Sequence, residues 1–124
     1  MFSHVMIGAN SIDDSKAFYD ATLGALGHRS GFVDPKGRCF YMADGNVFGL
    51  SVPIDGEPAC HANGGTIGFS AKSPEEVHAW HEAGLANGGV TIEDPPGQRE
   101  GSDYYLAYLR DPAGNKICVM HKVS

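Results

Sequence analysis

The hydrophobic pattern at the start of the chain predicts one strand followed by one helix. Apolar residues alternate with other residues from Val5 to Gly8, and this period of two is typical of a strand. From Ser11 the spacing changes, and apolar positions recur on one helical face up to Gly27. Asp14 follows Ser11 by three residues, as in a capping box at the start of a helix.

Three strands are predicted to follow this helix, over residues 28–33, 38–43 and 47–53. The segments between them carry turn residues, Asp-Pro-Lys-Gly at 34–37 and Asp-Gly-Asn at 44–46. The first part of the chain therefore predicts a βαβββ unit.

The same pattern occurs again in the second half of the chain. Residues 4–27 align with residues 66–89 without a gap, and six of the 24 positions are identical. Chance alone predicts roughly two identities for average composition. Residues 45–50 align further on with residues 114–119, so the offset grows from 62 to 69 and indicates a longer loop near 94–102 in the second unit. We interpret this as an internal repeat.

The second unit is therefore predicted to hold a strand at 65–69, a helix capped by Ser73 with Pro74 at its first position, and strands at 90–93, 103–110 and 116–122. We expect a single domain over residues 1–124, with module one at about 1–53, a Gly- and Pro-rich linker at 54–64 and module two at about 65–124. The fold class is α+β, with two tandem βαβββ modules that form a curved mixed sheet around a small cavity.

Composition and charge indicate which classes of molecule this protein is expected to bind. Hydrophobic residues make up 42% of the chain and charged residues 19%, which is a globular composition. The net charge of -6 argues against nucleic acid and anionic membranes as partners. It would suit a cationic small molecule. The chain starts with no signal-peptide pattern, and Cys39, Cys60 and Cys118 are odd in number, so we expect free thiols and a cytoplasmic location.

The residues also resemble a known family, the vicinal oxygen chelate superfamily of glyoxalase I, extradiol dioxygenases and bleomycin-resistance proteins. The resemblance spans nearly the whole chain. Its carriers are Phe-Ser-His-Val at 2–5, Ser-Lys-Ala-Phe-Tyr-Asp at 15–20, Gly-Thr-Ile-Gly-Phe at 65–69 and, most specifically, Arg-Asp-Pro-Ala-Gly-Asn-Lys-Ile at 110–117. The fold that the resemblance implies hosts many reactions and some pure binding proteins.

The resemblance also implies four positions for metal ligands. In metal-using members these are a His or Gln on the first strand of each unit and a Glu on the last strand of one or both. The corresponding residues here are His4, Thr66, Gly49 and Cys118, and His4 alone keeps a family ligand. A divalent metal such as Zn, Ni, Mn or Fe needs about three protein ligands, so we expect at most an incomplete site that rests on His4.

Strand alternation then predicts a cavity lined by small, modestly polar residues. We expect His4, Thr66 and Cys118 to face a small-molecule ligand, with Tyr105 of the neighbouring strand contributing a ring or a hydroxyl. Arg99 and Glu100 are candidates for a lid. Each of these residues also has a purely structural interpretation, as an ordinary strand residue or a buried thiol. His78 and His81 are interpreted as part of a solvated helix face.

Three functions remain open at this point. The first is a lyase-like enzyme that resembles lactoylglutathione lyase, acts on a small carbonyl compound and has a degraded metal site. The second is a metal-free binding protein of the bleomycin-resistance kind. The third is a dimerisation or sensor module that has lost its chemistry. The resemblance implies a homodimer, and the sequence does not identify catalytic residues.

Overall fold

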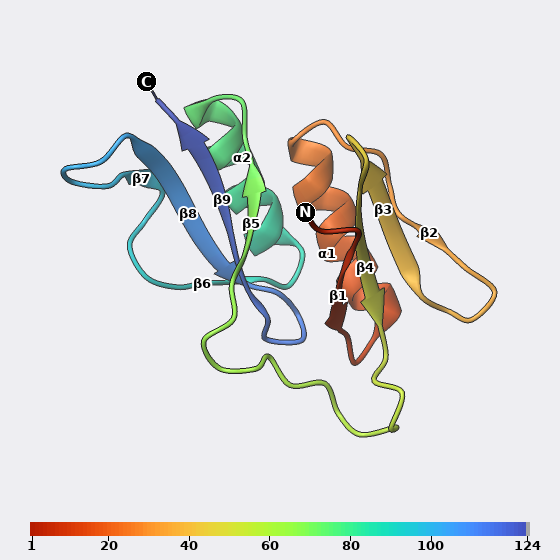
Figure 1. Ribbon diagram of the computed structural model, residues 1–124. Coiled ribbons are helices and arrows are strands. Elements are labelled where there is room, and N and C mark those ends of the chain that lie inside the picture. The colour runs from red at the N-terminus through yellow and green to blue at the C-terminus, as the bar shows by residue number, and fades with distance from the viewer. Residues whose placement is uncertain (124) are drawn as a thin grey trace.

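A computed structural model describes residues 1–123 and has an α+β fold of two modules that lie side by side (Figure 1). Module one contains β1 (Val5–Gly8), α1 (Ile12–Ala25), β2 (Phe32–Val33), β3 (Cys39–Ala43) and β4 (Asn46–Ser51). Module two contains β5 (Ile67–Ser70), α2 (Pro74–Ala86), β6 (Val90–Thr91), β7 (Gly97–Gln98), β8 (Tyr104–Arg110) and β9 (Lys116–Lys122). The predicted end of module two, Ser124, lies outside the described residues.

Each module builds its own mixed sheet, and the two sheets have equivalent strand orders. The orders are β1-β4-β3-β2 and β5-β9-β8-β6, with the first strand parallel to the last in both modules and the other neighbours antiparallel. The mixed α+β architecture is confirmed. The sheet is not closed, because the modules form two separate sheets. β7, which pairs with β8, lies in the segment that we predicted as a loop.

Both helices begin at the predicted serines. Ser11 Oγ accepts a hydrogen bond from Asp14 N at 3.1 Å, and Ser73 Oγ accepts one from Glu76 N at 3.2 Å. In the second module the Glu76 carboxylate also accepts from Lys72 N, one residue before the cap. These caps satisfy helix N–H groups that would otherwise lack partners.

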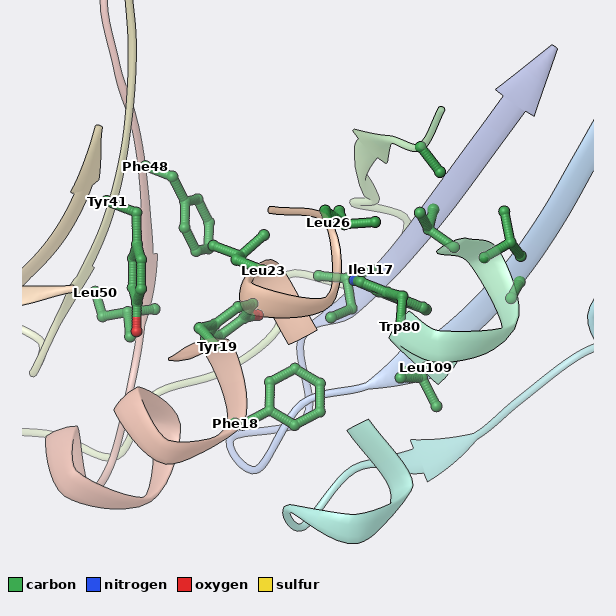
Figure 2. Packing of buried hydrophobic residues seen from close by; sticks show 14 of the residues in the cluster. Phe18, Tyr19, Leu23, Leu26, Tyr41, Phe48, Leu50, Trp80, Leu109 and Ile117 are labelled. Carbon is green, nitrogen blue, oxygen red and sulfur yellow. The ribbon is translucent and has the colours of Figure 1, made fainter. Parts of the chain in front are cut away.

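The hydrophobic core lies between the helices and the facing sides of the two sheets. Phe18 and Tyr19 of α1 and Trp80 of α2 are fully buried there (Figure 2). Ile117 and Val119 of β9 are also fully buried, whereas their neighbours on the other face are not part of the cluster. The strand alternation predicted for the sheets is therefore confirmed on the helix side.

A buried polar cluster joins the two modules. The Tyr19 hydroxyl of α1 donates to Asp111 Oδ2 at 2.6 Å, and Asn115 Nδ2 donates to the same oxygen at 2.9 Å. Asn115 Nδ2 also donates to the Gly8 carbonyl of β1 at 2.9 Å. Asp111 Oδ1 accepts from two backbone N–H groups of its own turn, at Ala113 and Asn115. The Asp-Pro-Ala-Gly-Asn turn therefore connects β8 and β9 to module one.

Neither helix within residues 1–123 has the length and apolar character required to cross a membrane. The three cysteines are free thiols, as predicted, with Cys39 and Cys118 buried and Cys60 exposed.

Candidate functional site

The four positions suggested by the superfamily resemblance do not form a cluster of metal ligands. His4 is exposed just before β1, with its Nδ1 atom 2.7 Å from Ser3 Oγ. Thr66 is exposed just before β5, and Cys118 is buried on β9. Within residues 1–123, no group of three or more His, Cys, Asp or Glu side chains is placed to hold a metal ion.

The last-strand position of module one is packed against neighbouring apolar side chains. Gly49 is buried and lies opposite Met6 in the parallel pairing of β1 with β4. A Cβ atom on Gly49 would overlap Met6 Sδ and would lie 2.8 Å from Met6 Cε and 3.0 Å from Phe40 Cδ1. Such approaches are closer than van der Waals contact allows. The carboxylate side chain that metal-using members carry could therefore stand at this position only if the Met6 and Phe40 side chains moved.

The equivalent position in module two holds a thiol that is a poor metal ligand. Cys118 is paired with Gly68 of β5, and its sulfur would lie 3.1 Å from a Cβ atom added there. Burial raises the pKa of the Cys118 thiol, and Glu93 raises it further, while Lys116 lowers it. The net shift is upward, and the thiolate is the form that binds metals. The residues present therefore do not fit the divalent metal of the superfamily.

Tyr105, the fourth candidate ligand-binding residue, makes contacts with α2. Its side chain faces α2, where its hydroxyl is 2.6 Å from His78 Nε2. The two rings meet edge-on, with centroids 5.6 Å apart. His81 of the same helix is bonded to Thr91 Oγ1 at 2.9 Å. Both histidines therefore have partners in module two, and a role for Tyr105 in ligand binding stays a prediction.

Arg99, a candidate lid residue, makes contacts within its own loop. Its guanidinium donates to the carbonyls of Pro95 at 3.0 Å and Gly97 at 3.1 Å. It also lies 5.9 Å from the centroid of the Tyr108 ring, a cation–π contact. These contacts hold the Arg99 side chain against its own loop and against β8.

A cavity of about 450 Å³ lies between the modules, and we call it the inter-module cavity. It opens where α1 ends and where β5 leads into α2. Its lining residues are Phe2, Ser3, His4, Val5, Leu23, Leu26, Gly27, His28, Arg29, Tyr41, Met42, Ala43, Asp44, Asn46, Val47, Phe48, Ile67, Gly68, Phe69, Ser70, Ala71 and Lys72. Of the four candidate ligand-binding residues, His4 alone lines it.

The depth of the inter-module cavity is apolar and aromatic. Leu23, Leu26 and Phe48 belong to the buried core, and Phe69 of β5 packs against that core from the other module. The rings of Phe48 and Phe69 meet at 88° with centroids 5.2 Å apart. A hydrophobic ligand could therefore contact both modules at once.

Tyr41 also lines the inter-module cavity, but its hydroxyl is already engaged. It donates to Asp20 Oδ1 at 2.9 Å and lies 3.2 Å from the Lys16 carbonyl. Burial raises the pKa of Tyr41 strongly, and the hydrogen bond to Asp20 raises it further. The phenol is therefore neutral over the physiological pH range and offers its ring, rather than a charge, to a ligand.

The mouth of the inter-module cavity is polar. Its exposed residues include His4, Arg29, Asp44 and Lys72, and His28 is half-buried. Sequence reasoning singled out His4 among them and missed the others. They come from four separate segments, so no local spacing could have grouped them.

The fold and its paired units define an α+β protein of tandem βαβββ modules with a cavity between them. The family model of the Glyoxalase/Bleomycin resistance protein/Dioxygenase superfamily matches residues 1–119. The chain belongs to this superfamily.

Solved structures support the same assignment. The chain is 56% identical to a glyoxalase/bleomycin resistance protein from Albidiferax ferrireducens T118, with a TM-score of 0.91 and 98% of each chain covered. A glyoxalase/bleomycin resistance protein/dioxygenase family enzyme from Burkholderia phytofirmans PsJN is 18% identical, with a TM-score of 0.74 and 97% of each chain covered.

Lactoylglutathione lyase from Agrobacterium tumefaciens is 22% identical, with a TM-score of 0.67 over 98% of this chain and 92% of that one. At this level of identity, and at that of the Burkholderia protein, the similarity shows the fold alone. No curated protein sequence matches the chain.

Proposed function

We propose that this protein binds a small organic molecule in the inter-module cavity and needs no metal ion to do so. The observation that carries the proposal is the cavity itself, whose volume of about 450 Å³ lies in the range of roughly 300–1,000 Å³ that small-molecule sites occupy. An apolar interior with a few polar groups at the mouth is the usual composition of such a site.

The chemistry of the four superfamily positions supports the metal-independent form of this proposal. Met6 and Phe40 fill the space at Gly49. Burial favours the neutral thiol at Cys118. Thr66 offers a neutral hydroxyl, which is a weak ligand beside imidazole and carboxylate. Binding at the inter-module cavity would then be closer in kind to a bleomycin-resistance protein than to a lyase.

The first test is metal content, measured on protein purified without a His tag. We expect no stoichiometric metal, and no change on titration with nickel, zinc, cobalt or manganese in either wild type or His4→Ala. Stoichiometric metal that is lost in His4→Ala would overturn the metal-independent proposal. It would favour the second candidate, a lyase-like enzyme with a non-standard metal site, to be assayed on adducts of α-ketoaldehydes with thiols.

The second test locates binding in the inter-module cavity. The fluorescent probe 1-anilinonaphthalene-8-sulfonate would be titrated with and without EDTA, and we expect equal affinity in both. Ser70 lines the cavity on the exposed edge of β5, so Ser70→Phe should reduce binding by partly filling the space. Ser30→Phe is the matched control, because Ser30 is exposed and does not line the cavity. Equal loss in both variants, or in neither, would contradict the proposed location.

We also expect a homodimer. One face of the first sheet exposes Phe32 to 51% and Met42, which also lines the inter-module cavity, to 60%, with Phe40 beside them. Apolar side chains that gather on an exposed surface are typical of protein interfaces. Light scattering coupled to size-exclusion chromatography should give twice the chain mass for wild type, and a Phe32→Lys/Met42→Lys variant should give a monomer. The cytoplasmic location stays a prediction, supported by the three free cysteines.

A further inference from the structure

We infer that the ligand of the inter-module cavity is an amphipathic anion: a small carboxylate that carries an aromatic or branched aliphatic tail. This inference rests on the proposed function and names its ligand class. It reverses the expectation from net charge, because the charge around the cavity differs in sign from the charge of the whole chain.

The lining of the inter-module cavity is locally basic. It includes two basic side chains, Arg29 and Lys72, and one carboxylate, Asp44. The imidazoles of His4 and His28 add hydrogen-bond donors to the same rim. The chain as a whole has a net charge of -6, so this excess of cations is a local feature.

The two cations are also available to a ligand. Among the described residues, Lys16, Arg38 and Lys116 form ion pairs with carboxylates, and Arg99 and Arg110 donate to backbone carbonyls. The side chains of Arg29 and Lys72 have no such partner within residues 1–123, and neither do those of Lys36 and Lys122. Two of these four unpaired cations lie on the rim of one cavity.

The backbone carbonyls at the end of α1 do not engage the Arg29 side chain. The Leu23 carbonyl accepts hydrogen bonds from the backbone N–H groups of Leu26 at 3.1 Å and His28 at 3.0 Å. The Gly24 carbonyl accepts from Gly27 N at 3.0 Å. Because these terminal carbonyls are satisfied by the chain itself, they do not compete with an anion for Arg29.

Lys72, the second basic residue of the lining, lies at the start of α2. Lys72 directly precedes the Ser73 cap, and a helix N-terminus carries positive potential. Glu75 and Glu76 of the first turn oppose this field. The Glu76 carboxylate accepts from Lys72 N at 2.8 Å, which is a backbone contact that leaves the Lys72 ammonium free.

The interior fits the tail of such a molecule. Phe48 and Phe69 present an edge-to-face aromatic pair, one ring from each module, and Leu23 and Leu26 line the same cavity. Buried apolar groups attract apolar ligand surface, while an aromatic tail could add edge or face contacts with the two rings. A charged head held at the rim and an apolar tail in the interior together match the two parts of the site.

The experiment compares three probes of nearly equal shape: 3-phenylpropanoate, its neutral amide 3-phenylpropanamide, and the cation 3-phenylpropylamine. Dissociation constants would be measured by NMR titration of ¹⁵N-labelled protein. We expect the carboxylate to bind about fivefold to tenfold more tightly than the amide, the size of effect that two partly exposed charge pairs produce. Added salt should reduce this preference and leave amide binding unchanged.

Variants that lack these charges then test whether Arg29 and Lys72 cause the preference for the carboxylate over the amide. In Arg29→Gln/Lys72→Gln the carboxylate and the amide should bind equally, whereas Lys36→Gln/Lys122→Gln should keep the preference. Equal binding of the first two probes to wild type, or tightest binding of the amine, would overturn the anion inference and leave the proposed function standing. If no probe binds to wild type at millimolar concentrations, the proposed function fails, and this inference fails with it.

Discussion

The bond between Tyr19 and Asp111 should be one of the most stabilising polar contacts in this protein. The Tyr19 side chain is fully buried, Asp111 is 3% exposed, and their oxygens are 2.6 Å apart. A hydrogen bond to a charged group contributes about 1.5–3 kcal/mol to stability. We therefore expect Tyr19→Phe to lower the free energy of unfolding by about 1.5–3 kcal/mol, because Asp111 Oδ2 keeps one side-chain donor, Asn115, instead of two.

The assay is urea unfolding followed by circular dichroism, with thermal melts alongside. For a domain of this length each kcal/mol should shift the melting temperature by roughly 3–5 °C. Tyr105→Phe is the matched control, because it removes a hydroxyl from an equally short 2.6 Å contact, with His78, that is exposed to solvent. We expect this control to lose less than about 1 kcal/mol. If Tyr19→Phe is no less stable than Tyr105→Phe, the reasoning from burial and charge is refuted.

Three further predictions concern pH, packing and thiol chemistry. Burial raises the pKa of Tyr19 above its usual value of 10.0, and the neighbouring Asp111 raises it further. Wild type should therefore lose stability from about pH 10 upward, at up to about 1.4 kcal/mol per pH unit. In urea titrations above that pH, the stability advantage of wild type over Tyr19→Phe should shrink. An undiminished gap at high pH would contradict this. Gly49→Ala should cost about 1–3 kcal/mol through overlap with Met6, and less in a Met6→Ala background; additive losses would argue against the overlap. Ellman's reagent should label the exposed Cys60 first and the buried Cys118 much more slowly. Mass spectrometry of partly labelled protein would give the two rates. Equal rates would refute the protected position of Cys118.

Local patterns in the sequence determined the elements and their order. The caps at Ser11 and Ser73 and the alternation along β9 depend on neighbouring residues, so they could be identified from spacing alone. The aligned units also predicted a βαβββ unit in each half, whereas the strand order within each sheet is a finding of the structure. β7 was missed because it is two residues long and pairs with β8 only through tertiary structure.

The tertiary structure decided the site. Residues that line the inter-module cavity, such as His4, Arg29 and Lys72, come from segments whose separation in the sequence carries no periodic signal. Whether a metal-ligand side chain fits at the superfamily positions also depends on packing between strands, since Met6 fills the space opposite Gly49. Net charge is a sum over the whole chain, whereas a ligand meets the few charges at one opening. The sequence by itself therefore determined the family fold, and the arrangement of the two modules decided where a cavity opens and which charges surround it.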